Sequence, residues 1–195
     1  MAKVLVLDDD VERLKMLCQG LDEAGHEVLA PQAGALNLVR LVKELAPDVI
    51  IIDTDSPDRD TLEHVCIVTR DDPRPIVMFA SDSDSGTIRA AVAAGVNAYV
   101  VNGLAEERIQ PILDVAIARF AQMQALRDEL TEARLQLEDR KAIERAKGIL
   151  MDTKNMSEAQ AYETLRKLAM DSSQRIVDIA RQVINMRDLL EQVSK

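Results

Sequence analysis

The chain has 195 residues, of which 47% are hydrophobic and 2% are aromatic, with no tryptophan. This length accommodates one large or two small domains, and the hydrophobic content excludes a disordered chain. The net charge of −10 is uneven: residues 1–112 carry −10, residues 113–140 carry −2 and residues 141–195 carry +2. The last segment is therefore the part whose charge favours approach to a polyanion.

The lack of targeting signals and the spacing of the cysteines predict a cytoplasmic protein. No apolar run approaches the roughly 20 residues that a membrane helix needs, and the first residues lack a signal-peptide pattern. Cys18 and Cys66 have no metal-binding or redox spacing. We expect both to be buried apolar residues in a reducing compartment.

The first 112 residues alternate short apolar segments with helical patterns. Helices are expected near residues 11–24, 34–46, 60–70, 84–94 and from 104 onward. The apolar segments predict buried strands at Val4–Leu7, Val49–Ile52, Ile76–Phe79 and Ala98–Val101, with a weaker candidate at His26–Leu29. Strict alternation with short connections predicts an α/β fold of the flavodoxin-like, doubly wound type, with helices on both faces of a parallel sheet.

Helix-end signals accompany this pattern. Asp60, followed by Glu63, resembles an N-terminal capping box with Asp in the Ser/Thr position. Gly25 and Gly95 fall just after helical patterns, where a left-handed C-cap is expected.

Three carboxylates follow predicted strands. Asp8 and Asp9 come directly after the first strand, and Asp53 directly after Val49–Ile52. Ligands of open parallel sheets bind at these strand ends. Like charges gathered there are costly unless a proton or a hard divalent cation relieves them, and oxygen ligands suit Mg²⁺. A carboxylate beside Mg²⁺ can also accept a phosphoryl group.

These residues resemble the receiver domains of response regulators. Leu7-Asp8-Asp9 is similar to the family's acidic pair, and Ile52–Pro57 is similar to its phospho-acceptor loop. The resemblance implies that Asp53 is the phosphorylation site. It also implies a Mg²⁺ site formed by Asp8, Asp9 and Asp53 together with the backbone carbonyl of Asp55.

Two positions depart from the receiver pattern. Ala80 stands where the family has Thr or Ser after the fourth strand, and Asn102-Gly103 stands where it has Lys-Pro after the fifth. By the resemblance, Ala80 removes a hydroxyl that senses the acyl phosphate, and Asn102 removes a cation that holds it. Two modes of control therefore stay open: a bound regulatory protein, or phosphorylation of Asp53 by a histidine kinase.

Nothing in the sequence predicts catalysis. His26 and His64 have no nucleophile or carboxylate pattern around them and are expected to be surface or strand-end residues. There is no glycine-rich phosphate loop and no nucleophile elbow. We therefore predict no catalytic residues and a protein that is not an enzyme.

Residues 113–140 predict a linker helix. Apolar residues at steps of three and four form a coiled-coil seam of about two heptads, made of Met123, Leu126, Leu130, Ala133 and Leu137. One interpretation is an amphipathic helix packed on its own chain. The favoured one is a stalk that forms a homodimer, because a long helix with polar flanks needs a partner for its seam.

The final segment predicts two further helices. Ser157 with Gln160 forms a capping box that opens a helix to about Met170. Asp171–Ser173 then breaks the pattern and is expected to supply N-cap oxygens for a last helix to about Gln192.

Residues 140–185 resemble the ANTAR module. The resemblance rests on Ala146-Lys147-Gly148 with Leu150-Met151, Ala161-Tyr162, Leu165-x-x-x-Ala169-Met170 and Ile176–Ala180. It implies a three-helix bundle, at the end of a coiled coil, that binds paired RNA hairpins in leader transcripts and prevents transcription termination. The whole chain is similar to nitrate-assimilation antiterminators of the NasT type, which a nitrate-sensing protein sequesters until ligand arrives. The expected domains are 1–112 (receiver-like), 113–140 (coiled-coil linker) and 141–195 (ANTAR).

Several residues of this module are candidates for RNA contact. Gly148 in mid-helix suggests close approach of RNA or of another helix. Tyr162, the only aromatic residue after Phe120, either stacks on an unpaired base or packs in the bundle core. The cations are candidate phosphate or base contacts, with a solvated face as the alternative for each: Arg145, Lys147, Arg166, Lys167 and Arg175.

The expected core of the bundle consists of Leu150, Met151, Leu165, Leu168, Ile176, Ile179 and Ala180. Two other functions stay open beside RNA binding: a DNA-binding response regulator with a helix-turn-helix output, and a signalling adaptor that binds protein alone. The first is weakened by the few cations of the last helix, Arg175, Arg181 and Arg187.

Overall fold

The computed structural model describes residues 1–8, 10–29, 38–102 and 106–193. The chain forms two compact units, Met1–Gln124 and Ala125–Lys195. None of the helices in the described ranges combines the length and apolarity that crossing a bilayer requires. The elements are β1 (Lys3–Asp8), α1 (Val11–Glu23), β2 (Glu27–Leu29), α2 (Leu38–Leu45), β3 (Val49–Thr54), α3 (Arg59–Asp71), β4 (Ile76–Ala80), α4 (Ser85–Ala94), β5 (Ala98–Val101), α5 (Glu106–Lys154), α6 (Glu158–Ser172) and α7 (Ile176–Val193).

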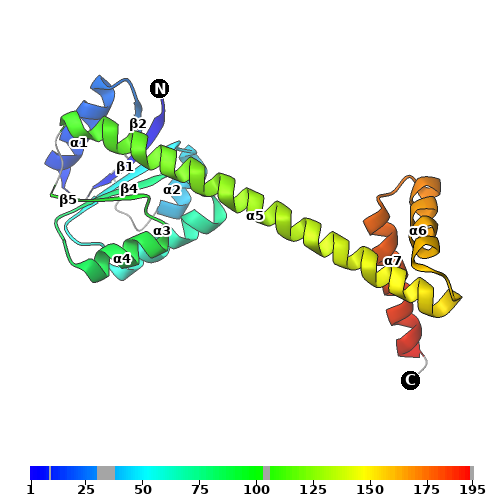
Figure 1. The fold of residues 1–195 in the computed structure, drawn as a ribbon. Coiled ribbons are helices and arrows are strands. Elements are labelled where there is room, and N and C mark those ends of the chain that lie inside the picture. Colours follow the sequence, from blue (N-terminus) through cyan, green and yellow to red (C-terminus); the bar gives the residue numbers. More distant parts are fainter. Residues whose placement is uncertain (9, 30–37, 103–105, 194–195) are drawn as a thin grey trace. The chain divides into compact units, whose positions relative to one another are not determined.

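The N-terminal unit is built on a five-stranded parallel sheet in the order β2-β1-β3-β4-β5 (Figure 1). This is the predicted doubly wound fold, and the weak strand candidate forms as Glu27–Leu29. The chain moves from β1 outward to β2 and returns to β3 on the other side of β1. The C-terminal ends of β1 and β3 therefore form the switch point where such folds bind ligands.

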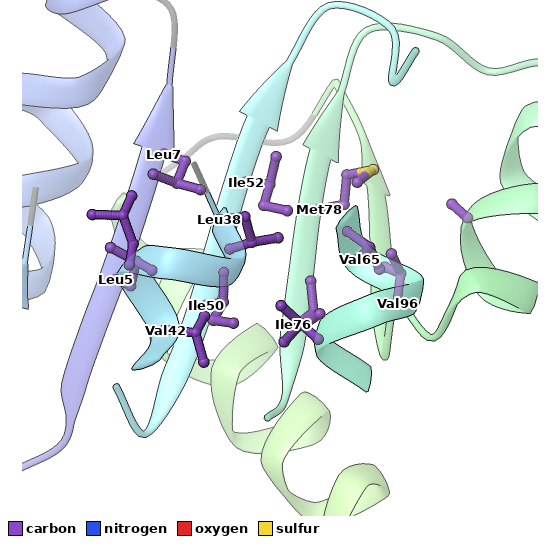
Figure 2. Close-up of a cluster of buried hydrophobic side chains, with 13 residues drawn as sticks. Leu5, Leu7, Leu38, Val42, Ile50, Ile52, Val65, Ile76, Met78 and Val96 are labelled. Atoms are coloured by element: carbon purple, nitrogen blue, oxygen red, sulfur yellow. The ribbon is translucent and has the colours of Figure 1, made fainter. Parts of the chain in front are cut away.

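Alternating residues of the strands pack in two separate cores, one on each face of the sheet. On one face, Leu5, Ile50 and Met78 pack with buried residues of α2, α3 and α4 (Figure 2). On the other face, Val6 and Ile51 pack with buried residues of α1 and α5. A central strand that is buried on both faces has to be apolar throughout, which explains the uninterrupted Val49–Ile52 run.

Helix ends in this unit match the glycine predictions but not the Asp60 prediction. Gly95 is a left-handed C-cap with φ 114°, and Gly25 follows α1 with φ 80°. The N-cap of α3 is Asp58, whose side chain accepts a hydrogen bond from the Thr61 amide; Asp60 lies inside the first turn. The Asp60 prediction was wrong because Asp58, two residues earlier and directly after Pro57, is the N-cap.

The expectation that both cysteines are buried was also wrong. Cys18 is partly buried and Cys66 is exposed. Cys66 follows the buried Val65 on α3, so the helical turn places it on the solvent side of the helix.

The C-terminal unit is a small three-helix assembly of the end of α5 with α6 and α7. The predicted capping box at Ser157 and Gln160 is present. The hydrophobic core of the C-terminal unit consists of Ala146, Leu165, Ala169, Ile179 and Ala180. The partly buried residues packed against it are Ile143, Leu150, Ile176, Val183 and Ile184.

Two predictions within this unit were wrong. Met151 and Leu168, expected in the core, are exposed, because each lies one helical step outside the buried stripe of its helix. The Asp171–Ser173 segment does not cap α7. Instead α6 runs on to Ser172, Ser173 is its left-handed C-cap, and the carbonyl of Arg175 accepts the first amide bonds of α7.

The apolar seam of α5 faces solvent. Met123, Leu126, Leu130 and Leu137 are about half exposed, and Ala133 is exposed as well. Within each unit, the described residues leave this seam exposed.

Candidate functional site

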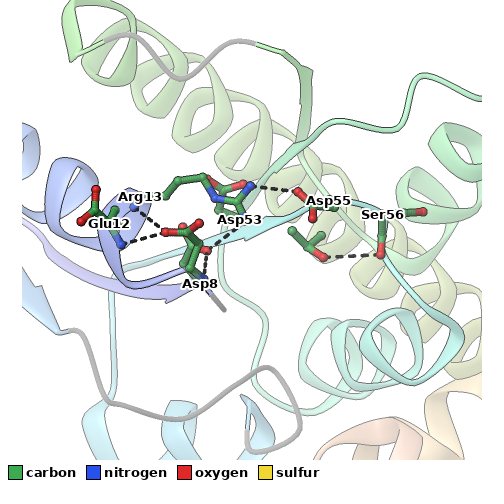
Figure 3. A network of polar contacts seen from close by, with 8 residues as sticks. Asp8, Glu12, Arg13, Asp53, Asp55 and Ser56 are labelled. Carbon is green, nitrogen blue, oxygen red and sulfur yellow. Dashed lines mark hydrogen bonds and ion pairs between the residues drawn. The ribbon is translucent and has the colours of Figure 1, made fainter.

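Two of the predicted carboxylates meet at the switch point of the sheet. Asp8 ends β1 and is the register partner of Asp53 on β3. Both strands extend beyond their predicted ends, so both aspartates are strand residues. The Asp8 side chain is fully inaccessible and that of Asp53 is 7% exposed. Parallel pairing thus forces two buried carboxylates to lie side by side (Figure 3).

A single arginine enters this pair from α1. The Arg13 guanidinium lies 3.4 Å from Asp8 Oδ1, and its Nε lies 3.9 Å from Asp53 Oδ2. Its Nη1 donates a hydrogen bond of 2.9 Å to Asp55 Oδ1, which is well exposed on the loop after β3. One cation therefore lies within 4 Å of three carboxylates, those of Asp8 and Asp53, which were predicted, and that of Asp55, of which only the backbone carbonyl was (Figure 3).

Asp10 prepares the position of this arginine. Its carboxylate caps α1 by accepting the amides of Glu12 and Arg13 at 2.8 and 3.1 Å. Its own amide donates to Asp8 Oδ1 at 2.7 Å. The cap thus links the end of β1 to the first turn of α1 and directs the Arg13 side chain back over the strand ends.

Burial governs the protonation of the pocket. The pKa of Asp53 is raised to about 6, first by desolvation and then by the neighbouring Asp8 charge, against the opposing effect of Arg13. Desolvation also raises the pKa of Asp8, against hydrogen bonds from the Asp10 amide and Arg13. The pKa of Arg13 is raised, first by its hydrogen bond to Asp55. The pocket therefore favours a fixed cation and resists additional negative charge.

The loops after β3 and β4 are tied together beside the pocket. The backbone carbonyl of Asp55 accepts hydrogen bonds from the amides of both Ser81 and Asp82, at 3.1 and 3.0 Å. Ser56 Oγ donates to the Asp82 carboxylate at 2.8 Å, and the Tyr99 hydroxyl donates to the Asp82 carbonyl at 3.0 Å. The carbonyl that the receiver resemblance assigns to a metal ion is thus already bonded to two amides.

The two departures from the receiver pattern lie at the neighbouring strand ends. Ala80 is the last residue of β4, is buried, and pairs with Thr54 and Val101 in the sheet. Asn102 follows β5 in a left-handed conformation with φ 48°, and its amide donates to the Ala80 carbonyl. Gly103 lies outside the described residues, as does Asp9.

The C-terminal cations are mostly paired within their own unit. Lys147 is 8% exposed and donates to Glu144 at 2.9 Å and Glu158 at 2.7 Å. The three arginines are exposed and pair with exposed or half-buried carboxylates: Arg145 with Asp188, Arg166 with Glu163, and Arg175 with Asp178. Lys167 lines a shallow pocket with Lys154, between the end of α5 and the start of α6.

Two uncharged candidates are open to solvent. Tyr162 is 44% exposed, so it lies outside the bundle core. A Cβ placed on Gly148 would meet nothing within 4 Å, so no helix of the described chain approaches closely there. Gly148 instead lines an open hollow with Arg145, Ile149 and Arg187.

Sequence reasoning missed Arg13 and Lys154. A signal for Arg13 was present: cations in the first turn of a helix oppose the helix dipole, and here one follows an acidic run. An arginine in this first turn is favourable only if the nearby carboxylates compensate its positive charge. Lys154 carried no such signal, because its neighbourhood depends on the turn between α5 and α6.

The sheet order and the paired strand-end aspartates define a receiver-type regulatory domain, joined to a small helical unit. Comparison with protein families agrees: the response regulator receiver domain matches residues 4–114, and the ANTAR domain matches residues 131–184. The chain belongs to the response regulator receiver family and carries an ANTAR domain, which makes it a response regulator of the antiterminator family.

Similar proteins align either with nearly the whole chain or with one part of it. The chain is 29% identical over 182 residues to the transcriptional regulatory protein PdtaR of Mycobacterium tuberculosis, covering 93% of this chain and 89% of that one. It is 44% identical over 68 residues to a nitrate regulatory protein of Klebsiella oxytoca, covering 35% of this chain and 17% of that one. Among solved structures, chemotaxis protein CheY4 of Vibrio cholerae matches with a TM-score of 0.53 and 26% identity, over 60% of this chain and 98% of that one.

Receiver domains generally bind Mg²⁺ at this acidic site, but the residues present fit such an ion only in part. In favour, Asp8 Oδ2 is buried without a hydrogen-bond partner. Against, Arg13 bridges Asp8 and Asp55, and the Asp55 carbonyl is bonded to two amides. No cluster of three or more His, Cys, Asp or Glu with metal-binding geometry occurs in the described ranges, which omit Asp9. The arrangement in this structure therefore does not fit Mg²⁺.

Proposed function

We propose that this protein is a non-enzymatic transcription antitermination regulator that binds paired RNA hairpins in leader transcripts through its ANTAR domain. The observation that carries the proposal is the match of the ANTAR domain to residues 131–184, which span the end of α5, all of α6 with its exposed Tyr162, and the first half of α7. Hairpin loops offer unpaired bases to a small helical module, whereas the deep major groove of an RNA duplex does not.

The proposed RNA contacts are Tyr162, the open surface at Gly148, and the cations Arg145, Arg166, Lys167 and Arg175. Tyr162 stacks on a loop base. The arginines now paired with surface carboxylates exchange these partners for phosphates at little cost, because exposed ion pairs contribute little stability. Lys147 is more enclosed, so its proposed role is to anchor the start of α6 through Glu158 and to meet RNA only at the edge of that pair.

We propose a homodimer through the exposed seam of α5. The seam presents about two heptads of half-exposed apolar side chains on a helix with charged flanks, which is the surface that a second copy of the same helix covers best. This assignment divides the chain into the receiver domain (1–112), the stalk (113–140) and the ANTAR domain (141–195).

Control of the receiver by a bound regulatory protein is favoured over phosphorylation. Ala80 and Asn102 lack the hydroxyl and the ammonium group that would sense and hold an acyl phosphate. The nitrate-regulatory relative makes a ligand-sensing protein of the nitrate-sensor kind a suitable partner. Phosphorylation of Asp53 by a histidine kinase is the second candidate, since the acceptor position itself is present.

A gel-shift comparison tests RNA recognition. The full chain is titrated at fixed salt into a leader RNA with two hairpins and into duplex DNA of the same sequence. We expect binding to the RNA alone, and weaker binding by Tyr162→Ala than by the control Met170→Ala, which alters another exposed side chain of α6. Equal or tighter DNA binding would support the DNA-binding alternative, and binding to neither would support the protein-only adaptor.

Light scattering tests the dimer. The wild-type chain should have twice the mass of the double variant Leu126→Glu/Leu130→Glu, because four charges in one seam repel each other across the interface. Val92→Glu, at an exposed apolar residue of α4, is the matched control and should keep the dimer mass. A monomeric wild type, with and without RNA, would remove the stalk from the proposal.

Incubation with Mg²⁺ and a small phosphodonor separates the two modes of control. We expect no stable acyl phosphate on Asp53 and no change in RNA affinity. Stable phosphorylation that raises RNA affinity, and that is lost in Asp53→Asn, would establish the second candidate in place of partner control.

A further inference from the structure

We infer that Arg13 is the built-in cation of the acidic pocket and takes the place that a divalent metal ion holds in receiver domains. The receiver unit is then complete without metal, and Mg²⁺ binds only weakly, in competition with Arg13. This inference concerns the pocket alone and does not depend on RNA binding.

The first support is the reach of one guanidinium. Three of its nitrogens face three different carboxylates: Nη2 faces Asp8, Nη1 faces Asp55 and Nε faces Asp53. The Asp8 and Asp53 side chains are almost inaccessible, so the nearest counter-charge has to come from inside the protein. A planar fork with fixed donors suits several carboxylates at once, which a compact ammonium group does not.

The second support is independent of Arg13. The Asp55 backbone carbonyl, which the receiver resemblance assigns to the metal, accepts the amides of Ser81 and Asp82. A carbonyl oxygen has two lone pairs, and both are used here. Entry of a metal ion would therefore require two changes: withdrawal of Arg13, and release of two hydrogen bonds that join the β3 and β4 loops.

The third support is how the arginine is held. Arg13 lies in the first turn of α1, where the helix dipole disfavours a cation. Asp10 caps that turn through the Arg13 amide and is itself bonded to Asp8. A cation fixed by its own backbone has no translational freedom to lose, so it outcompetes a dissolved ion of moderate affinity.

Calorimetric titration of Mg²⁺ into the metal-free full chain tests the inference. Arg13→Gln keeps much of the side-chain volume and removes the charge. We expect it to bind Mg²⁺ at least about tenfold more tightly than the wild type, because the carboxylates lose their only partner cation in the described pocket. Arg70→Gln is the matched control: Arg70 pairs with the exposed Asp71 on α3, and its loss should leave Mg²⁺ binding unchanged.

Thermal unfolding of the wild type covers the case in which Arg13→Gln does not fold. We expect its midpoint to be the same in chelator and in millimolar Mg²⁺. Arg13→Lys retains the charge without the fork, and its midpoint should rise with Mg²⁺. A wild type that Mg²⁺ stabilises strongly, or equal Mg²⁺ affinities of the wild type and Arg13→Gln, would overturn the inference.

Discussion

The two units of this protein differ in how deeply their ion pairs are buried. In the receiver unit, Asp8 and Asp53 are buried against each other and share one arginine. In the C-terminal unit, Arg145, Arg166 and Arg175 lie on the surface and pair with carboxylates that water also reaches. Buried charges tolerate no loss of a partner, whereas exposed pairs break and re-form at little cost. The first arrangement suits a fixed state of the pocket, and the second suits a surface that exchanges carboxylates for phosphates.

The hydrophobic cores of the two units also differ, because the core of the C-terminal unit is much smaller. The receiver sheet has a closely packed cluster on each face, with 13 and 11 buried residues. The cluster of the C-terminal unit has five, two of which are large side chains. Stability therefore depends on few contacts in the C-terminal unit, which also leaves apolar side chains of α5, α6 and α7 exposed. Such a unit is suited to gain stability from a partner or from RNA.

The largest expected effect tests this difference. Leu165→Ala removes the largest fully buried side chain of the small core and should cost about 3 kcal/mol of unfolding free energy, enough to melt the unit at moderate temperature. Leu168→Ala on the same helix is the matched control, since Leu168 is 46% exposed, and should change stability by less than about 0.5 kcal/mol. Circular dichroism at increasing urea measures both variants. Equal effects would contradict the assignment of Leu165, and not Leu168, to the core of the C-terminal unit.

The same two leucines show what the sequence can and cannot predict. The heptad-like spacing of α6 marks Leu165 and Leu168 equally as core, because both fit a stripe of about 100°. Which of them is buried depends on the direction from which α7 approaches, and no local pattern contains that direction. Lys147 is similar: Glu144 is visible three residues earlier, but Glu158 joins the pair only through the turn between α5 and α6.

The receiver fold and its acidic pair could be predicted because they depend on short-range rules. Apolar runs alternating with helices imply a parallel sheet, and residues at the ends of its central strands have to meet. The register that places Asp8 beside Asp53 follows from that. Arg13 could not be assigned in the same way, because its side chain acts across three elements and its role depends on the rotamer it adopts.

A second prediction, of intermediate size, tests the buried carboxylates. The pKa of Asp53 is raised to about 6 by burial, so the native state holds its proton more tightly than the unfolded chain does. The stability from this protonation is complete below about pH 4 and is lost as the pH rises through about 6. Asp53→Asn, which stays neutral, should therefore raise the unfolding free energy by roughly 2 kcal/mol at pH 7 and by almost nothing at pH 4.

Urea unfolding of both proteins in chelator, at a series of pH values, measures this difference. Asp84→Asn, at the exposed N-cap of α4, is the control and should show no such gain at neutral pH. If Asp53→Asn instead loses stability at pH 7, the attraction of Arg13 outweighs the cost of burying the carboxylate.

The smallest expected effect compares one glycine from each unit. Gly95 has φ 114°, and an added Cβ would lie 2.4 Å from Thr69 Oγ1, so Gly95→Ala should destabilise the receiver by more than about 1 kcal/mol. Gly148 lies inside α5 with nothing within 4 Å of such an atom. Gly148→Ala should therefore stabilise the C-terminal unit by about 1 kcal/mol, the helix propensity gain of alanine.

Glycine at a position where alanine is more stable needs another reason, and the proposed one is that RNA approaches the backbone of α5 at Gly148. Gly148→Ala should then weaken RNA binding in gel shifts while it raises the urea midpoint of the C-terminal unit. Stability and affinity changing in opposite directions would separate an RNA contact from a folding defect, because a variant that merely damaged the bundle would lower both. A stabilised variant with unchanged RNA affinity would place the RNA on another face, such as the one that bears Tyr162.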